Sequence, residues 1–201
     1  MKTREKILLI AEEEFSKLGY DGLSMNELVK KLEINKATVY YHFKDKRALY
    51  QTILENILDD LNSELESRLD TSLNSKELLK EYVKVYIQKI KERPTIVPLM
   101  LREIANFGSN SDTNIVILFE KMISRVYEIL NNLDLKDKYK EIDPYLIDSI
   151  IYGTINNFYA IQMSDLPIGT VKGGLKADIN KSLDFACDFI TDIILDAICK
   201  E

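Results

Sequence analysis

Residues 36–42 carry the side chains best suited to chemistry in this sequence. Five of them bear hydrogen-bonding groups or rings, namely Lys36, Thr38, Tyr40, Tyr41 and His42. Such groups donate hydrogen bonds to the phosphate oxygens and base edges of nucleic acids. Val39 and Phe43 lie four residues apart and form the only apolar side of the segment. A helix this short and polar is unsuited to filling a core, so the pattern predicts an element that contacts nucleic acid.

This helix needs a second helix to support it. Ser24 and Glu27 have the spacing of a capping box, and an apolar stripe follows in residues 28–32. Residues 33–35 form a break, at the end of which Asn35 can cap the next helix. The pattern predicts a helix-turn-helix.

Residues 36–49 resemble the signature of the tetracycline-repressor (TetR) family of one-component transcriptional regulators. The shared pattern is Thr-x-Tyr-x-x-Phe-x-x-Lys-x-x-Leu, which begins at Thr38, and the detailed resemblance covers roughly residues 5–55. The family often has Ala-Gly at the turn and Gly just before the Thr. This chain has Leu32-Glu33 and Ala37 at those positions. The first difference bears on the backbone strain of the turn. The second changes what can approach a base at residue 37.

Side-chain chemistry, aided by this resemblance, predicts nine DNA-contacting residues: Ser24, Asn35, Lys36, Ala37, Thr38, Tyr40, Tyr41, His42 and Lys46. The phosphate contacts are assigned to Ser24, Thr38, Tyr40 and Lys46. The base edges or the thymine methyl group are assigned to Asn35, Lys36, Ala37 and Tyr41. His42, the only histidine, matches a phosphate-contacting position of the family; the alternative is a turn-capping surface residue.

Charge is distributed unevenly along the chain. The net charge of −6 by itself argues against nucleic-acid binding. Residues 1–50, however, hold ten Lys and Arg against eight Asp and Glu, whereas the other 151 residues hold 17 against 25. A basic face on an acidic body is typical of a DNA reader with a separate regulatory part. A merely solvated charged face is the alternative.

The whole sequence predicts an all-α fold of about nine helices. We expect a three-helix helix-turn-helix head in residues 1–47 and a helical ligand-binding and dimerisation body in residues 48–201. Segments 144–163 and 177–199 are apolar on more than one face, which requires cover on both sides. In the family that the chain resembles, the last two helices form a two-fold dimer through a four-helix bundle. A homodimer through these two helices is therefore predicted.

The candidate ligand-binding residues combine apolar walls with a few polar anchors. They are Tyr86, Met100, Phe107, Phe119, Tyr127, Tyr152, Asn156 and Tyr159. The alternative for each of them is plain core or dimer seam. Asn156 is the most informative, because an inward amide on an apolar helix needs a partner. A ligand, a buried water or the other subunit would each satisfy it.

The leading hypothesis is a homodimeric transcriptional regulator, usually a repressor, that binds a palindromic double-stranded operator and is released by a small molecule. The alternative is a helical protein–protein adaptor without effector control. An enzyme is not expected, because the chain has one histidine and lacks Cys-x-x-Cys, a phosphate-binding loop and Gly-x-Ser-x-Gly. No cofactor or metal is expected.

We also expect a cytoplasmic protein that makes no membrane contact. No apolar run approaches the ~20 residues of a membrane span, and the acidic first helix is unlike a secretory signal.

Cys187 and Cys199 fall in one predicted helix, about 18 Å apart at ~1.5 Å per residue, which is too far for a bridge within the helix. Reduced structural thiols are expected, with an inter-subunit bridge or a thiol sensor as alternatives.

Overall fold

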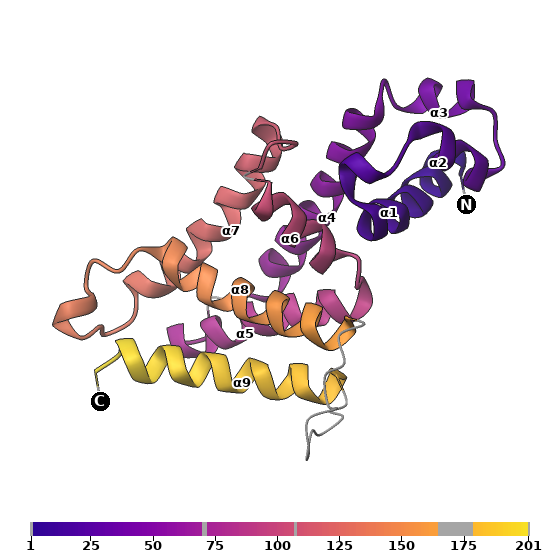
Figure 1. Cartoon of the computed structure of the whole chain (residues 1–201). Coiled ribbons are helices and arrows are strands. Elements are labelled where there is room, and N and C mark those ends of the chain that lie inside the picture. Colours follow the sequence, from indigo (N-terminus) through magenta and orange to yellow (C-terminus); the bar gives the residue numbers. More distant parts are fainter. Residues whose placement is uncertain (1, 70–71, 107, 165–178, 201) are drawn as a thin grey trace, which may run out of the picture. The chain divides into compact units, whose positions relative to one another are not determined.

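The structure is a computed structural model that describes residues 2–69, 72–106, 108–164 and 179–200. These residues form nine α-helices, one short 3-10 helix and a single isolated bridge between Leu135 and Cys199. The elements in chain order are α1 (Thr3–Gly22), α2 (Met25–Leu32), α3 (Lys36–His42), α4 (Lys46–Arg68), α5 (Ser75–Glu92), α6 (Ile96–Ala105), α7 (Thr113–Asn131), η1 (Asp137–Tyr139), α8 (Pro144–Met163) and α9 (Ile179–Ile198) (Figure 1). The predicted all-α fold is confirmed.

The helices pack into two compact units. The first contains residues 1–60 and 93–118, and the second contains residues 61–92 and 119–201. Helices α4 and α7 each contribute residues to both units. The functional boundary predicted after residue 47 concerns binding roles rather than packing, and it stays a prediction.

Apolar side chains at helical spacing build the core of the first unit. Ile7 and Phe15 on α1, Leu28 on α2, Val39 on α3 and Leu49 on α4 are all completely buried. Burial stabilises each large apolar side chain by roughly 1.5–3 kcal/mol. Isolated helices shorter than about 12 residues are marginal in water, so α2 and α3 depend on this burial to form.

Side-chain caps define where α2, α3 and α4 begin. Ser24 Oγ accepts a hydrogen bond from the Glu27 backbone N–H at 3.2 Å, and Glu27 Oε2 accepts one from the Ser24 N–H at 3.0 Å. This confirms the predicted capping box. Asn35 Oδ1 accepts from the N–H two residues later at 2.9 Å, and Asp45 Oδ1 accepts from the N–H three residues later at 2.8 Å. Each such cap stabilises a helix by about 1 kcal/mol.

The turn between α2 and α3 requires one residue in the left-handed conformation, and that residue is Glu33 (φ 55°, ψ 37°). No other non-glycine residue in the described ranges has a positive φ. The Glu33 N–H donates to the Lys30 carbonyl at 3.3 Å, which closes the last turn of α2. The departure from glycine at this position therefore leaves the turn intact but places a side chain where it costs roughly 1–2 kcal/mol.

Charged groups hold α6 against α1 within the first unit. The buried Glu12 carboxylate on α1 accepts hydrogen bonds from the Arg93 guanidinium, with Nε to Oε1 at 2.6 Å. Arg102 on α6 donates to the Lys17 carbonyl at 3.0 Å. That carbonyl lies near the break in α1 at Gly19, whose φ is 75°. This φ favours glycine, and a Cβ at Gly19 would lie 2.7 Å from Arg102 Nη1, so the guanidinium would have to shift.

In the second unit, α9 packs against both α5 and α8. Val83 and Ile90 on α5 and Ile151 on α8 are fully buried. Cys187 on α9 and Cys199, which follows the end of that helix, are both free and buried. Among the described helices, none combines the length and apolarity needed to cross a lipid bilayer.

We predict that Glu33→Gly raises the free energy of unfolding by roughly 0.5–1 kcal/mol, because relief of the left-handed side chain exceeds the extra entropy of glycine in the unfolded chain. Glu33→Val should lower stability by more than about 1 kcal/mol, since β-branched residues fit that conformation worst. Lys30→Gly, on an exposed helical position nearby, is the matched control and should lower stability by about 1 kcal/mol. Thermal denaturation measures all three; a destabilised Glu33→Gly variant would contradict the prediction.

Candidate functional site

Helix α3 buries one face and leaves the predicted DNA-contacting side chains on the other. Val39 is fully buried, whereas Tyr41 is 85% exposed and Tyr40 is 41% exposed. The Lys36 ammonium lies 5.8 Å from the centre of the Tyr40 ring. The half-buried His42 ring packs edge-on against Tyr41 at 5.1 Å. The phenol groups and the ammonium are thus held on the surface, where a DNA backbone could reach them.

The remaining predicted DNA contacts lie on the same segment of the first unit. Ser24 and Asn35 use a side-chain oxygen in their caps, which leaves the Ser24 hydroxyl proton and the Asn35 amide N–H groups able to donate. Ala37 is exposed and Thr38 is half-buried. Lys46 lies at the start of α4, with Nζ 4.4 Å from the centre of a neighbouring ring on α1. The nine residues are therefore confined to the N-caps of α2 and α3, to α3 itself and to the first residue of α4.

The basic side chains of this region differ in their roles. Lys31 Nζ pairs with the buried Glu14 carboxylate at 2.5 Å, so its charge is used within the fold. Lys36 Nζ donates to Asn26 Oδ1 at 2.9 Å, a neutral partner that leaves its charge uncompensated. Lys44 is exposed. A count of bases along the sequence overestimates the positive charge available to a phosphate, because it cannot show which ammonium is paired.

Three of the predicted ligand-binding residues come together inside the second unit. The Tyr86 hydroxyl on α5 donates to Asn156 Oδ1 on α8. The rings of Tyr86 and Tyr152 meet edge to face, with centroids 4.0 Å apart. Asn156, which was expected to need a ligand, a water or a second subunit, therefore finds its partner in the same chain.

Asp148 joins this tyrosine cluster and was missed by sequence analysis. The Tyr82 hydroxyl donates to Asp148 Oδ1 at 2.8 Å, and the Tyr152 hydroxyl donates to the Tyr82 hydroxyl at 3.3 Å. Burial raises the pKa of Asp148 to about 7, while the hydrogen bond from Tyr82 opposes the rise. The available signal was an acidic residue one helical turn before Tyr152 on an otherwise apolar helix.

The other predicted ligand-binding residues are not gathered at one place. Tyr159 is buried, Phe119 is half-buried and Tyr127 is 55% exposed. Met100 is buried in the first unit. Phe107 lies outside the described residues. Over the described part of the chain, no group of three His, Cys, Asp or Glu side chains could hold a metal ion.

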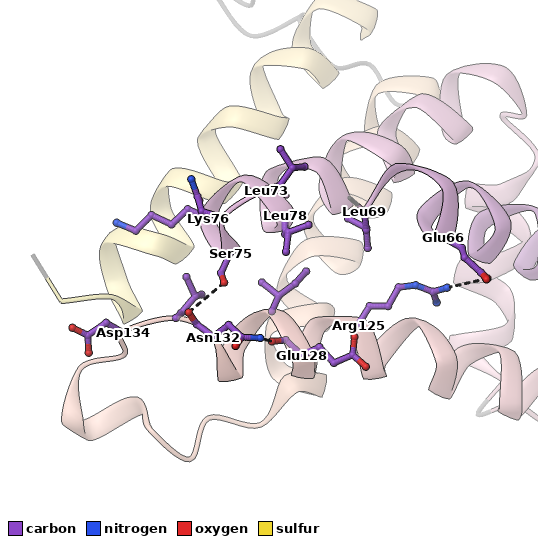
Figure 2. Close-up of a pocket in the computed structure, with 13 residues that line it drawn as sticks. Glu66, Leu69, Leu73, Ser75, Lys76, Leu78, Arg125, Glu128, Asn132 and Asp134 are labelled. Carbon is purple, nitrogen blue, oxygen red and sulfur yellow. Dashed lines mark hydrogen bonds and ion pairs between the residues drawn. The ribbon is translucent and has the colours of Figure 1, made fainter. Parts of the chain in front are cut away.

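An open groove of about 870 Å³ lies in the second unit, between the end of α4, the start of α5 and the end of α7. Figure 2 shows Leu69 just after α4, Leu73 just before α5 and Leu78 on α5 at the groove. It also shows Arg125 extending from α7 toward Glu66. None of the eight predicted ligand-binding residues lines it. Sequence patterns could not find this groove, because its walls come from three segments far apart along the chain.

The helix-turn-helix segment is similar in sequence to known regulatory proteins. Residues 7–53 match the family model described as bacterial regulatory proteins, tetR family. The HTH-type transcriptional regulator QacR of Staphylococcus aureus is 44% identical over 54 residues, which are 27% of this chain and 29% of that protein. The IcaR protein of Staphylococcus epidermidis, a negative transcriptional regulator of the biofilm operon icaADBC, is 38% identical over 53 residues, or 26% and 29% of the two chains. The matched segment thus spans less than a third of each relative.

Similarity of fold extends over the whole chain, beyond the segment that matches in sequence. The ketosteroid transcriptional regulator KstR2 of Mycobacterium tuberculosis superposes with a TM-score of 0.72 at 16% identity, covering 100% of this chain and 96% of that one. At this identity the match shows the fold alone. Both sequence relatives, QacR and IcaR, are described as transcriptional regulators.

We predict that Asp148→Asn stabilises the protein at pH 8 and flattens its pH dependence. The folded pKa of about 7 exceeds the ordinary aspartate value of 3.8, so the folded state binds the extra proton between about pH 4 and 7. Stability from this group therefore falls as the pH rises through that window and stays low above it. The gain in the variant at pH 8 should be about 2–4 kcal/mol, as the shift implies.

The measurement is the midpoint of thermal unfolding from pH 5 to pH 8. Asp188→Asn, at an exposed aspartate of the same unit that pairs with Lys80, is the control and should keep the wild-type slope. An Asp148→Asn profile parallel to the wild type would contradict the prediction.

Proposed function

We propose that this chain, which carries a tetR-family DNA-binding segment in residues 7–53, is a DNA-binding transcriptional regulator. The observation that carries the proposal is the exposed row of donors on α3, whose opposite face is buried at Val39. Phosphate contacts are assigned to Ser24, Thr38, Tyr40, His42 and Lys46, and base contacts to Asn35, Lys36, Ala37 and Tyr41, as the side-chain types predict.

We further propose repression relieved by a small molecule. The IcaR relative is a negative regulator by its description, which supports repression here. Release requires that the effector bind the non-binding conformation more tightly than the DNA-binding one, since equal affinity would shift nothing. The predicted effector residues Tyr86, Tyr152, Asn156 and Tyr159 are packed against one another or buried. An effector at this cluster must therefore displace their mutual contacts.

The proposed dimer uses the outer faces of α8 and α9. On α9, Phe185, Phe189 and Ile193 recur every four residues and are 68%, 53% and 51% exposed. The rings of the two phenylalanines stack at 5.7 Å. On α8, Ile150 is 40% exposed, and a Cβ at Gly153 would meet nothing within 4 Å. A second copy would cover this apolar surface and allow close approach at the glycine.

Such a dimer would present two copies of α3 to one duplex. A two-fold protein matches a palindromic operator, with half-sites about one helical turn or a multiple of it apart. We place this activity in the cytoplasm. A protein–protein adaptor would also use the apolar face of α8 and α9, but it would leave the exposed donors on α3 unexplained.

The DNA contacts are tested with a duplex selected from a random pool by the full-length protein. Tyr40→Phe removes one hydroxyl and should weaken binding roughly tenfold, the usual effect of losing a hydrogen bond to a charged group. Lys46→Gln should weaken binding and lower the slope of log affinity against log salt by about one. Tyr127→Phe, on an exposed tyrosine of the second unit, is the control. A wild-type affinity that is insensitive to salt would refute the DNA-binding role.

The dimer is tested by sedimentation of variants that place a charge on the proposed interface. Phe189→Glu and Ile150→Glu should each convert a dimer into a monomer, because an unpaired charge would be buried in the interface. Both should also weaken operator binding at least tenfold, since the two heads are no longer linked. Val116→Glu, on an apolar residue of similar exposure in the first unit, should remain dimeric. A monomeric wild-type protein would disprove the arrangement.

A further inference from the structure

The groove in the second unit has the dimensions of a small-molecule site. Its volume of about 870 Å³ lies within the range of about 300–1,000 Å³ that ligand pockets occupy. No aromatic residue is among the described residues that line it, in contrast to the tyrosine cluster between α5 and α8. Its occupant would be recognised by aliphatic surface and by the polar groups at its ends.

One end of the groove holds a guanidinium that is largely covered but weakly neutralised. The Arg125 side chain is only 13% exposed. Its Nη1 donates to Asn62 Oδ1 at 2.7 Å and to the Lys121 carbonyl at 3.0 Å, both of which are neutral acceptors. Its ion pair is with Glu66 Oε2 at 3.7 Å, which is beyond hydrogen-bond distance (Figure 2).

Glu66 cannot neutralise this end of the groove. The same oxygen, Oε2, lies 3.0 Å from Lys121 Nζ, so one carboxylate serves two cations. Glu66 is 67% exposed and Lys121 is 50% exposed, and solvent screens both of them. Arg125 is screened less because it is covered. A net positive charge therefore remains at the guanidinium, and an anion within hydrogen-bond distance would satisfy it.

The other acidic groups of the lining are Glu128, drawn near Arg125 in Figure 2, and Asp134. Glu128 is exposed, so water screens its charge. Asp134 pairs with Lys200 Nζ at 3.2 Å. Figure 2 shows Asp134 and Lys76 at the end of the groove away from Arg125 and Glu66.

The floor between the two ends is aliphatic, formed by Leu69, Leu73, Leu78, Ile129 and Leu133. Four of these side chains are half-buried and the isoleucine is buried. Flexible aliphatic walls without rings suit an unbranched chain more than a flat aromatic ligand. Each methylene buried there can strengthen binding by up to about fourfold.

We propose that this groove binds an aliphatic carboxylate, with its head on Arg125 and its tail along the five aliphatic side chains. The claim concerns binding by the protein alone, so it does not depend on the proposed DNA-binding function. If the ligand also acts as the effector, it does so from a place other than the tyrosine cluster.

The experiment is calorimetric titration of the full-length protein, without DNA, with decanoate, decanol and decyltrimethylammonium below their micelle concentrations. The three probes share one tail and differ only in the head group. Decanoate should bind at least tenfold more tightly than decanol, the cation should bind more weakly still, and octanoate should be weaker than decanoate. Arg125→Gln should weaken decanoate binding at least tenfold and leave decanol binding unchanged.

Two further variants complete the test. Lys121→Gln, at the half-exposed cation that pairs with Glu66 and does not line the groove, should change decanoate affinity less than threefold. Leu69→Glu adds a negative charge at a half-exposed wall position and should abolish decanoate binding, which keeps the test decisive if Arg125→Gln fails to fold. The proposal is overturned if the wild-type protein does not bind decanoate, if decanol or the cation binds as tightly, or if both groove variants bind decanoate normally. Operator binding by unliganded Arg125→Gln should equal that of the wild type, which separates this proposal from the DNA-binding role.

Discussion

The burial of one side of α3 is the constraint on which the rest of the first unit depends. A helix of seven residues has too few internal hydrogen bonds to persist alone. Val39 and Phe43 anchor it by inserting into a core built by α1, α2 and α4. Because these two residues lie on one side, the phenol groups of Tyr40 and Tyr41 are turned to the surface without any further device. Stability and the direction of the donors therefore have the same cause.

The backbone around this anchor is specified by a few unusual residues. Glu33 takes a left-handed conformation that sets the angle at which α3 leaves α2. Gly19 breaks α1 where Arg102 of α6 reaches the exposed carbonyls of its last turn. Just before the start of α6, Arg93 donates a hydrogen bond to Glu12 of α1. The recognition segment and α6 thus belong to one packed unit, connected by charge-assisted bonds that cost more to break than exposed ion pairs.

The second unit contains two different environments for buried polar groups. Between α5 and α8, the hydroxyls of Tyr82 and Tyr86 find acceptors in Asp148 and Asn156, and the cluster is closed. This closure places a carboxylate in low dielectric and raises its pKa. Around Arg125 the opposite holds, because a covered cation faces an open groove, donates its hydrogen bonds to neutral acceptors and shares the exposed Glu66 carboxylate with Lys121. The first arrangement holds α5 and α8 together, and the second favours recognition of an anion.

Local pattern was enough to determine the helices, the caps at Ser24 and Asn35, and the helix-turn-helix, because each depends on residues within one or two helical turns. The family resemblance likewise rested on contiguous residues. Only tertiary structure decided which distant groups meet: that Asn156 is satisfied by Tyr86 of the same chain, and that α4, α5 and α7 enclose a groove. Such contacts join residues many positions apart, and a periodic pattern records which face of a helix is buried but not what it is buried against.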